Sequence, residues 1–300
     1  MSIAASPAAK TAAATLIGFS AIVLWSLLAA LTAAAGQIPA FQMNAMCFGI
    51  GALAAMVLWV RQPARARALR QPAYVWAHGI AGLFGYHALY FAALRLAPPA
   101  EASLINYLWP LLIVLFSSLL PGERLRAFHV AGALIGFAGV AALSINADFT
   151  ARPGHALGYA LAFAAAFFWS AYSVLSRRMA GVPTDAVVGF CAATALLSLA
   201  CHLLFETSVW PQSFGAWAAI VALGLGPVGA AFYAWDIGCK RGDIRLLGVS
   251  AYAAPVLSTL ALVVSGFAEP TWALWLACGL IVLGALVASW DKVFARRKAA

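Results

Sequence analysis

The sequence predicts an all-α, polytopic membrane protein with ten transmembrane helices in two inverted five-helix repeats. Three observations predict this fold: the composition, the spacing of the apolar runs, and a weak similarity between the two halves of the chain. Of the 300 residues, 65% are hydrophobic and 9% are charged, whereas a soluble domain usually carries about 25% charged residues. So few charges cannot cover a water-facing surface, and we therefore expect lipid to solvate most of the molecule.

Ten apolar runs each approach the length of about 20 residues that a membrane-spanning helix needs. The first five cover residues 15–35, 41–60, 73–94, 100–120 and 127–145, and the second five cover residues 155–176, 184–205, 214–239, 244–267 and 271–290. The first run is longer than the core of a cleaved signal peptide, which has about 7–15 residues. We therefore expect it to stay in the membrane.

The basic residues predict the orientation. If the N-terminus lies in the cytoplasm and the chain crosses the membrane ten times, 16 of the 18 Lys and Arg residues fall on the cytoplasmic side. These are Lys10, Arg61, Arg65, Arg67, Arg70, Arg124, Arg126, Arg177, Arg178, Lys240, Arg241, Arg245, Lys292, Arg296, Arg297 and Lys298; Arg95 and Arg152 fall outside. Such a bias is typical of multi-pass proteins of the bacterial inner membrane. It predicts that both termini are cytoplasmic, and it explains the net charge of +9 without a nucleic-acid partner.

Short matching segments divide the chain into two halves, residues 1–148 and 149–300. Matching segments lie 144 to 147 residues apart, at 24–26 and 168–170, at 107–110 and 252–255, and at 132–135 and 279–282. Each half contains five predicted helices. Because five is odd, the second half must insert upside down, which is the inverted repeat found in many secondary transporters.

Several motifs, in the same order along the chain, carry a family resemblance. They are Ala102-Ser103-Leu104-Ile105 followed by Pro110, then Pro121-Gly122-Glu123-Arg124-Leu125, and Lys240-Arg241-Gly242-Asp243 followed by Pro255. Together they resemble the EamA branch of the drug/metabolite transporter superfamily, and within it the bacterial exporters of aromatic amino acids. The resemblance implies ten helices in two inverted repeats and an export function. The second half departs from the pattern, with Ala268-Glu269 where the first half has Gly122-Glu123.

The third predicted helix carries candidate cavity residues. At about 100° per residue, Tyr86 and Tyr90 lie about 40° apart, with His87 close by, and Gly82 leaves space beside the rings. Tyrosines also pack in ordinary cores, and a buried histidine is often simply hydrogen-bonded. An ionisable side chain deep in a membrane helix, however, usually faces the interior of the bundle. We therefore expect these residues to line a path.

The fourth predicted helix adds Asn106, Tyr107 and Trp109 to the cavity and has Pro110 as a candidate kink or gate. Proline in a helix removes a hydrogen bond and permits a bend. The bend could move during gating or be a static kink; the sequence leaves both open. Trp109 is one of four deep tryptophans, with Trp25, Trp169 and Trp235, whereas the other seven fall near helix ends.

The sixth and ninth predicted helices complete the candidate cavity with Trp169, Tyr172, Ser250 and Tyr252, and Pro255 is the second candidate kink. Ser250 and Tyr252 point about 160° apart and cannot both face one cavity directly. Serines in membrane helices also bond their own backbone. These residue types predict a broad, nearly uncharged cavity that fits an amphipathic zwitterion with an aromatic side chain.

The acidic residues favour facilitated export without ion coupling. Asp236 lies one turn before Lys240, a spacing that permits an ion pair, and no carboxylate is expected to stand unpaired at the middle of the membrane. His87 is the candidate proton carrier if transport is coupled. The alternatives are a drug or metabolite exporter and, more distantly, an intramembrane enzyme, which would need a cluster of ionisable catalytic groups.

No cofactor or metal site is predicted. The five cysteines form no CxxC pair, and the GxGxxG match at residues 224–229 lies inside an apolar helix with no strand before it. Gly132 and Gly136 form a GxxxG motif, which packs helices closely either within one chain or between two. The predicted partners are therefore a small solute and membrane lipid, with monomer or dimer left open.

Overall fold

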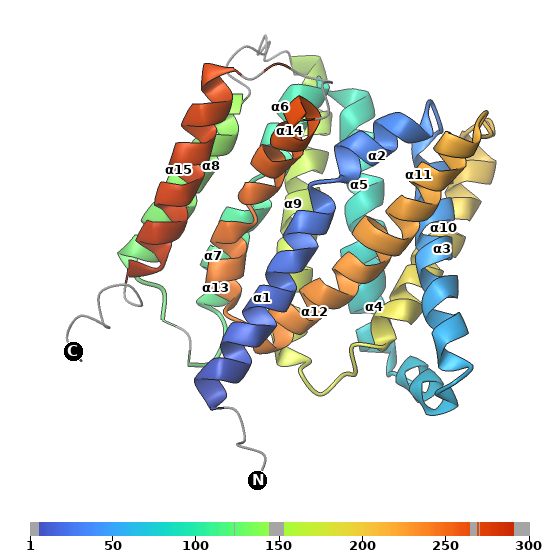
Figure 1. Ribbon diagram of the computed structural model, residues 1–300, viewed down its shortest axis with the longest axis horizontal. Helices are drawn as coiled ribbons and strands as arrows, with labels where there is room; N and C mark the ends of the chain where they lie inside the picture. The colour runs from blue at the N-terminus through green and yellow to red at the C-terminus, as the bar shows by residue number, and fades with distance from the viewer. Residues whose placement is uncertain (1–5, 123, 144–152, 265–268, 270, 291–300) are drawn as a thin grey trace.

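The computed structural model describes residues 6–122, 124–143, 153–264, 269 and 271–290, and over these residues it contains helices and no strands. Figure 1 shows long helices that run side by side and tilt together across the molecule. The predicted boundary between residues 148 and 149 lies outside the described residues. So do Glu123, Arg152 and the four basic residues of the C-terminal tail, Lys292, Arg296, Arg297 and Lys298.

Within the described residues, seven helical segments are long and apolar enough to cross a membrane. They are α1 (Pro7–Trp25) with α2 (Leu28–Ala35); α3 (Ala40–Trp59); α6 (Pro99–Asn106) with α7 (Trp109–Ser117); α9 (Ala156–Arg178); α10 (Ala186–Phe205); α11 (Phe214–Leu225), η4 (Gly226–Ala230) and α12 (Ala231–Arg241); and α13 (Ile244–Ser250) with α14 (Ala253–Val264). Two shorter apolar helices are α8 (Ala127–Leu143) and α15 (Trp272–Ala288). A further helical run joins α4 (Ala73–Ile80), η2 (Ala81–Gly85) and α5 (Tyr86–Leu96), and two short 3₁₀ turns are η1 (Pro63–Leu69) and η3 (Pro153–His155).

Several of these segments are interrupted, and proline explains two of the breaks. Pro110 lies at the second position of α7 and Pro255 in the first turn of α14. Neither residue has an N–H to bond the carbonyl one turn earlier. The helix therefore stops at Asn106 and restarts at Trp109, and in the same way stops at Ser250 and restarts at Ala253. The elements η2 and η4 are single π-helical turns inside otherwise α-helical runs.

The helices pack in pairs that are distant in sequence: α1 with α12, α3 with α10, α5 with α9, α7 with α13 and α8 with α15. In Figure 1 the α8–α15 pair forms one edge of the molecule, and α3, α10 and α11 form the opposite edge. Gly132 explains the closeness of α8 and α15, because a Cβ there would lie 2.5 Å from the carbonyl oxygen of Gly284. The GxxxG motif of α8 thus faces a helix of the same chain.

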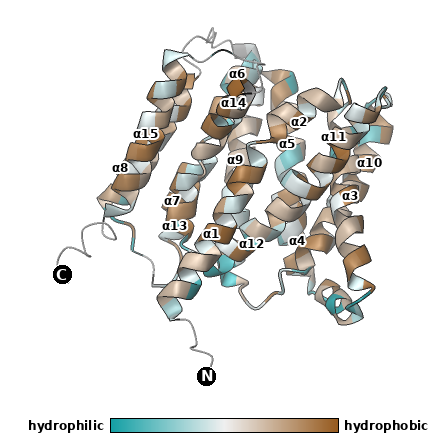
Figure 2. Ribbon diagram, viewed as in Figure 1, coloured by the Kyte–Doolittle hydropathy of each residue, from teal (hydrophilic) through white to brown (hydrophobic). Residues whose placement is uncertain are grey.

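The outer surface suits lipid. Large apolar side chains lie exposed along the helices, among them Leu16, Val57 and Phe214. Figure 2 shows hydrophobic residues along most of each helix and hydrophilic residues around η1 and the turn between α12 and α13. We call this end of the bundle the η1 side; the start of α1 and the end of α15 lie toward it (Figure 1).

The opposite end of the bundle is held by a buried carboxylate. Glu206 accepts hydrogen bonds from the backbone N–H groups of Phe41 and Gln42 at the start of α3 (both 3.1 Å), from Arg95 (3.1 Å) and from His202 (3.0 Å). Arg95 therefore pairs with Glu206 and not with Glu101, its neighbour in sequence. These contacts join the ends of α3, α5 and α10.

Candidate solute-binding site

Four tryptophans meet in the middle of the bundle, and each ring contacts the other three. They come from four helices: Trp25 from α1, Trp109 from α7, Trp169 from α9 and Trp235 from α12. Their six centroid separations range from 5.1 Å for Trp25–Trp235 to 6.5 Å for Trp25–Trp109. With Phe232, which lies 5.7 Å from Trp169 and 5.9 Å from Trp25, they form what we call the central aromatic cluster.

Hydrogen bonds fix the orientation of these rings. The Trp25 indole N–H donates to the carbonyl oxygen of Pro227 (3.0 Å), which belongs to the π-helical turn η4. The Trp235 indole donates to the hydroxyl of Ser173 (3.0 Å). Ser170 donates to the main-chain carbonyl of Trp109 (2.9 Å), which ties the backbone of α7 to α9 and leaves the Trp109 ring to be oriented by packing. An indole N–H buried in apolar surroundings needs such a partner, so the cluster is anchored at its polar edges while its ring faces stay apolar.

Two tyrosines of α5 extend the cluster toward α6. Tyr86 lies 5.5 Å from Trp169 and stacks on Tyr90 at 6.1 Å. The Asn106 side-chain amide donates to the Tyr86 hydroxyl (3.1 Å), and the Tyr90 hydroxyl lies 2.9 Å from the Ser103 hydroxyl. The Asn106 side-chain oxygen is buried and has no hydrogen-bond partner among the described residues. A buried acceptor without a donor is costly, so it marks a place where a donor group of a solute would be favoured.

His87 lies beside the cluster with its ring among other rings. Its edge meets Phe48 at 5.2 Å, and Phe232 lies at 6.4 Å. Its Nδ1–H donates to the carbonyl of Leu83 in the preceding turn (2.7 Å). This is the simple structural role that a buried histidine often has, and it leaves Nε2 as the nitrogen available to another group.

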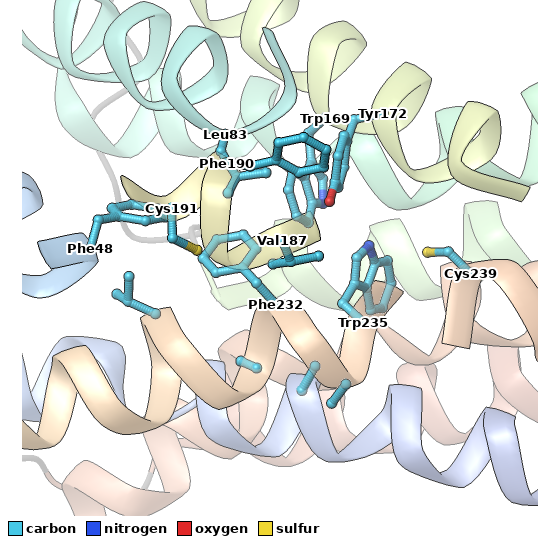
Figure 3. Packing of buried hydrophobic residues seen from close by; sticks show 14 of the residues in the cluster. Phe48, Leu83, Trp169, Tyr172, Val187, Phe190, Cys191, Phe232, Trp235 and Cys239 are labelled. Atoms are coloured by element: carbon cyan, nitrogen blue, oxygen red, sulfur yellow. The ribbon is translucent and has the colours of Figure 1, made fainter. Parts of the chain in front are cut away.

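A stack of rings leads from the cluster toward the η1 side. Tyr172 stacks on Trp169 at 5.3 Å and on His78 of α4 at 4.8 Å. Gly82 in η2 makes room for this stack, because a Cβ there would lie 2.2 Å from the Tyr172 ring. Figure 3 shows Trp169 and Tyr172 pointing across the core toward Phe232 and Trp235 of the facing helix.

The structure places other predicted site residues elsewhere. Tyr252 is fully buried in a separate apolar cluster with α8 and α15, where its ring lies against Gly136, and Tyr107 packs on the edge of that cluster. Ser250 is half-buried at the end of α13. Pro255 follows in α14, and its carbonyl accepts a bond from Thr259 (2.9 Å). The predicted residues that gather around the cluster are thus those of α5, α6, α7 and α9.

Sequence reasoning left Trp25, Phe232, Trp235, Phe48 and His78 out of the predicted site. Trp25 and Trp235 carried a signal, since both are deep tryptophans and Trp25 lies in the repeated segment 24–26. His78 carried the signal of an ionisable residue in a predicted membrane helix, as His87 did. Phe48 and Phe232 carried none, because a single apolar ring looks the same whether it faces lipid or the core.

The serines of α9 show why hydroxyls alone were a weak signal. Ser170, Ser173 and Ser176 donate to the carbonyls one turn earlier at 2.7, 2.9 and 2.8 Å. Such bonds satisfy the hydroxyl within its own helix. Ser173 still has an acceptor function toward Trp235, so it orients the cluster without facing a solute.

The arrangement binds by ring faces and a few polar edges. Offset and edge-on ring pairs each stabilise a contact by about 0.5–1.5 kcal/mol beyond burial, and tryptophan faces attract ammonium groups. Trp109, Trp169 and Trp235 are buried, whereas Trp25, Tyr86 and Tyr90 are partly exposed, so the site has ring surface that another molecule can reach. The site therefore suits a flat, apolar group.

Comparison with known proteins agrees with this architecture. The model of the EamA-like transporter family matches the chain twice, at residues 12–145 and 156–290. A solved crystal structure aligns with a TM-score of 0.88 at 59% sequence identity and covers 93% of this chain and 98% of its own.

Curated relatives with the name aromatic amino acid exporter YddG include proteins from two bacteria. The protein from Ancylobacter novellus is 60% identical over 278 residues, covering 92% of this chain and 96% of its own length. The protein from Salmonella typhimurium is 26% identical and covers 91% and 96%. With the family model matching both halves and a relative this similar over nearly the whole length, the chain belongs to the EamA-like transporter family.

Proposed function

We propose that this protein exports aromatic amino acids from the bacterial cytoplasm by alternating access, with the solute side chain held among the rings of the central aromatic cluster. One observation carries the proposal: tryptophans from four different helices all contact one another in the middle of the bundle. A cluster built from four helices is disrupted by any movement between them, so an aromatic solute can replace ring–ring contacts when the helices part. The names of the relatives at 60% and 26% identity support the same substrate class.

The fold we propose has ten spans in two inverted repeats, residues 1–148 and 149–300. Irregularities that recur 144 to 145 residues apart support it. The π-helical turn Ala81–Gly85 recurs 145 residues later as Gly226–Ala230, and the break at residues 107–108 recurs 144 residues later at 251–252. The two matches of one family model, at 12–145 and 156–290, have the same spacing.

Helix pairing supports the repeat independently. In the proposed repeat, α1 corresponds to α9, α3 to α10, α5 to α12, the span α6–α7 to the span α13–α14, and α8 to α15. Exchanging the halves turns the α1–α12 pair into the α9–α5 pair. It leaves the pairs α3–α10 and α8–α15 unchanged, and α6–α7 stays paired with α13–α14, through the contact of α7 with α13. The 17 residues of α8 and of α15 reach about 25 Å, close to the thickness of the hydrocarbon core.

The η1 side is the cytoplasmic side in this proposal. It carries the arginines of η1 and the basic ends of α9 and α12, as the excess of basic residues in cytoplasmic loops requires. Both termini then lie in the cytoplasm of the bacterial cell, with the solute leaving toward the Glu206 end.

We propose that export runs down the solute's own gradient. The buried carboxylates described here are already engaged: Asp236 with Lys240 at 2.8 Å, and Glu206 with Arg95 and His202. A carboxylate that carries protons across a membrane has to be able to release its partner. His87 is the candidate carrier if coupling is found.

Transport by the full chain in proteoliposomes tests the proposal. We expect movement of labelled phenylalanine and tryptophan, little movement of threonine, and no requirement for a pH gradient. Tyr90→Ala and Trp109→Ala should each lower phenylalanine transport about tenfold or more, since each removes a ring contact and leaves a cavity. Tyr74→Ala and Trp272→Ala are matched controls, because those side chains are 64% and 60% exposed.

The possible outcomes separate the parts of the proposal. If both site variants transport phenylalanine as fast as the wild type, at equal amounts of inserted protein, the solute binds elsewhere. Transport of a drug panel but not of phenylalanine would replace the substrate class. Strict dependence on the pH gradient would replace the uncoupled mechanism and direct attention to His87.

A further inference from the structure

A small cavity lies beside the ring stack that leads from the central aromatic cluster to the η1 side. Its volume is about 10 Å³, room for roughly one water molecule. We call it the Asp236 pocket; it is lined by Val75, His78, Ser176, Met179, Val182, Phe190, Asp236 and Lys240. The lining comes from four helices, α4, α9, α10 and α12, and from the turn after α9, so the pocket lies where these helices converge.

The pocket holds a buried ion pair. The Lys240 ammonium lies 2.8 Å from an Asp236 carboxylate oxygen, and the two side chains are 5% and 3% exposed. Lys240 also donates to the carbonyl of Val182 (2.9 Å), and the Thr184 hydroxyl donates to Asp236 (2.6 Å). Both charges are therefore satisfied in this conformation, and both groups face one small cavity.

The pair is continuous with the proposed solute site. Asp236 follows Trp235 of the central aromatic cluster directly in α12. On the facing helices, Tyr172 stacks between Trp169 and His78, and His78 lines the pocket with its Nε2 3.1 Å from the Ser176 hydroxyl. A solute moving between the η1 side and the cluster along this stack passes both charges.

Stability alone is a weak reason for this pair. Buried ion pairs often stabilise a fold no better than apolar side chains of the same volume, and ionisable residues within membrane helices usually mark a solute pathway. The chemistry of the cluster shows what is missing there: its rings recognise an aromatic side chain but offer no pair of opposite charges for an ammonium and a carboxylate. Asp236 and Lys240 are such a pair.

We propose that Asp236 and Lys240 form a headgroup subsite for zwitterionic amino acids on the η1 side of the cluster. The solute ammonium binds Asp236 and the solute carboxylate binds Lys240, so each buried charge exchanges one opposite charge for another and neither is left unpaired. Because the cavity holds only about 10 Å³, this exchange requires the pair to separate. The inference rests on the proposed export of aromatic amino acids and adds how their charged end is selected.

Three solutes with the same ring test the assignment: phenylalanine, 2-phenylethylamine without the carboxylate, and 3-phenylpropionate without the amine. Transport of each by the full chain in proteoliposomes is compared for wild type, Lys240→Met, Asp236→Asn and the double variant. Lys240→Met should shift the kcat/KM ratio toward 2-phenylethylamine, and Asp236→Asn toward 3-phenylpropionate, each by about ten- to a hundredfold, the effect of one charge-assisted hydrogen bond. Arg65→Met and Asp185→Asn are matched controls, since that pair is 3.8 Å apart and Arg65 is 49% exposed.

The double variant keeps the inference falsifiable if a single variant does not fold, because it leaves no unpaired buried charge. It should transport phenylalanine with a KM raised at least about tenfold and should lose the preference for the zwitterion. Equal losses of kcat/KM for all three solutes, or wild-type selectivity in the double variant, would overturn the subsite. The Asp236–Lys240 pair would then have only a structural role. Failure of the wild-type protein to transport phenylalanine would instead remove the proposed function.

Discussion

The central aromatic cluster and the α8–α15 pair are packed in opposite ways. The cluster joins four helices through large rings, 5.1 to 6.5 Å between tryptophan centroids. In the α8–α15 pair, glycines let the two backbones touch. Gly132 and Gly284 are so close that a Cβ on either would lie 2.5 to 2.6 Å from the other's carbonyl oxygen.

This difference in packing indicates which helices can move relative to one another. Backbones in direct contact have no side chain between them that can rotate, so the α8–α15 pair acts as one rigid unit. Rings held at their edges can re-stack at modest cost, and the helices that carry them contain π-helical turns and proline breaks. We infer that the edge pair maintains the shape of the bundle while the cluster rearranges.

The largest expected effect comes from breaking the rigid region. Gly132→Val places a branched side chain against the backbone of Gly284 and Ala288, and that backbone cannot give way locally. Overpacking typically destabilises by about 1–3 kcal/mol, and contact with backbone puts this case at the upper end. Thermal unfolding in detergent should therefore shift downward by several degrees.

Gly279→Ala in α15 is the matched control for this prediction, because nothing lies within 4 Å of a Cβ there. Its unfolding midpoint should equal that of the wild type. Transport per molecule of folded protein should be unchanged in both variants. A transport defect in Gly132→Val that exceeds its loss of folded protein would contradict the division between a rigid and a moving region.

An intermediate effect is expected at the polar edge of the cluster. Asn106→Leu keeps the approximate volume of the side chain and removes both its bond to Tyr86 and its unpartnered oxygen. We expect the KM for phenylalanine to rise about five- to tenfold, because the Tyr86 ring loses a hydrogen bond that orients it, with little change in thermal stability. The KM for 2-phenylethylamine and for 3-phenylpropionate should rise equally, since the charged ends are assigned to Asp236 and Lys240. A rise only for the solutes that carry an amine would show that Asn106 binds the ammonium and would contradict the Asp236 assignment.

The smallest expected effect on transport comes from removing a hydrogen bond that orients one ring of the central aromatic cluster. Ser173→Ala removes the acceptor of the Trp235 indole and leaves every ring contact in place. A buried hydrogen bond of this kind contributes about 1 kcal/mol, so transport should fall a few-fold. Ser170→Ala is a useful comparison, because Ser170 bonds the main-chain carbonyl of Trp109 and not its ring. Full activity of Ser173→Ala would show that ring packing alone orients Trp235.

Much of the secondary structure could be predicted because a membrane helix is encoded locally. The run expected at 155–176 is α9, Ala156–Arg178, and the ion pair that the spacing of Asp236 and Lys240 permits forms at 2.8 Å. Residues 100–120 were expected as one span with a candidate kink at Pro110, and the helix is interrupted between Asn106 and Trp109. Hydropathy does not reveal this break, since the apolar pattern continues through it; the proline does.

The sequence by itself determined that this chain is a bundle of apolar helices with tryptophans far from the helix ends. Charge content, run length and the one-turn spacing of Asp236 and Lys240 are local properties, and lipid as a solvent makes them decisive. Only the tertiary structure decided that Trp25 and Trp235, separated by most of the chain, share one cluster, that Tyr252 belongs to another, and that the glycines of α8 face α15. These helices are largely apolar on both their lipid-facing and core-facing sides, so hydropathy cannot tell a lipid-facing ring from a core-facing one, and the contacts between helices make that choice.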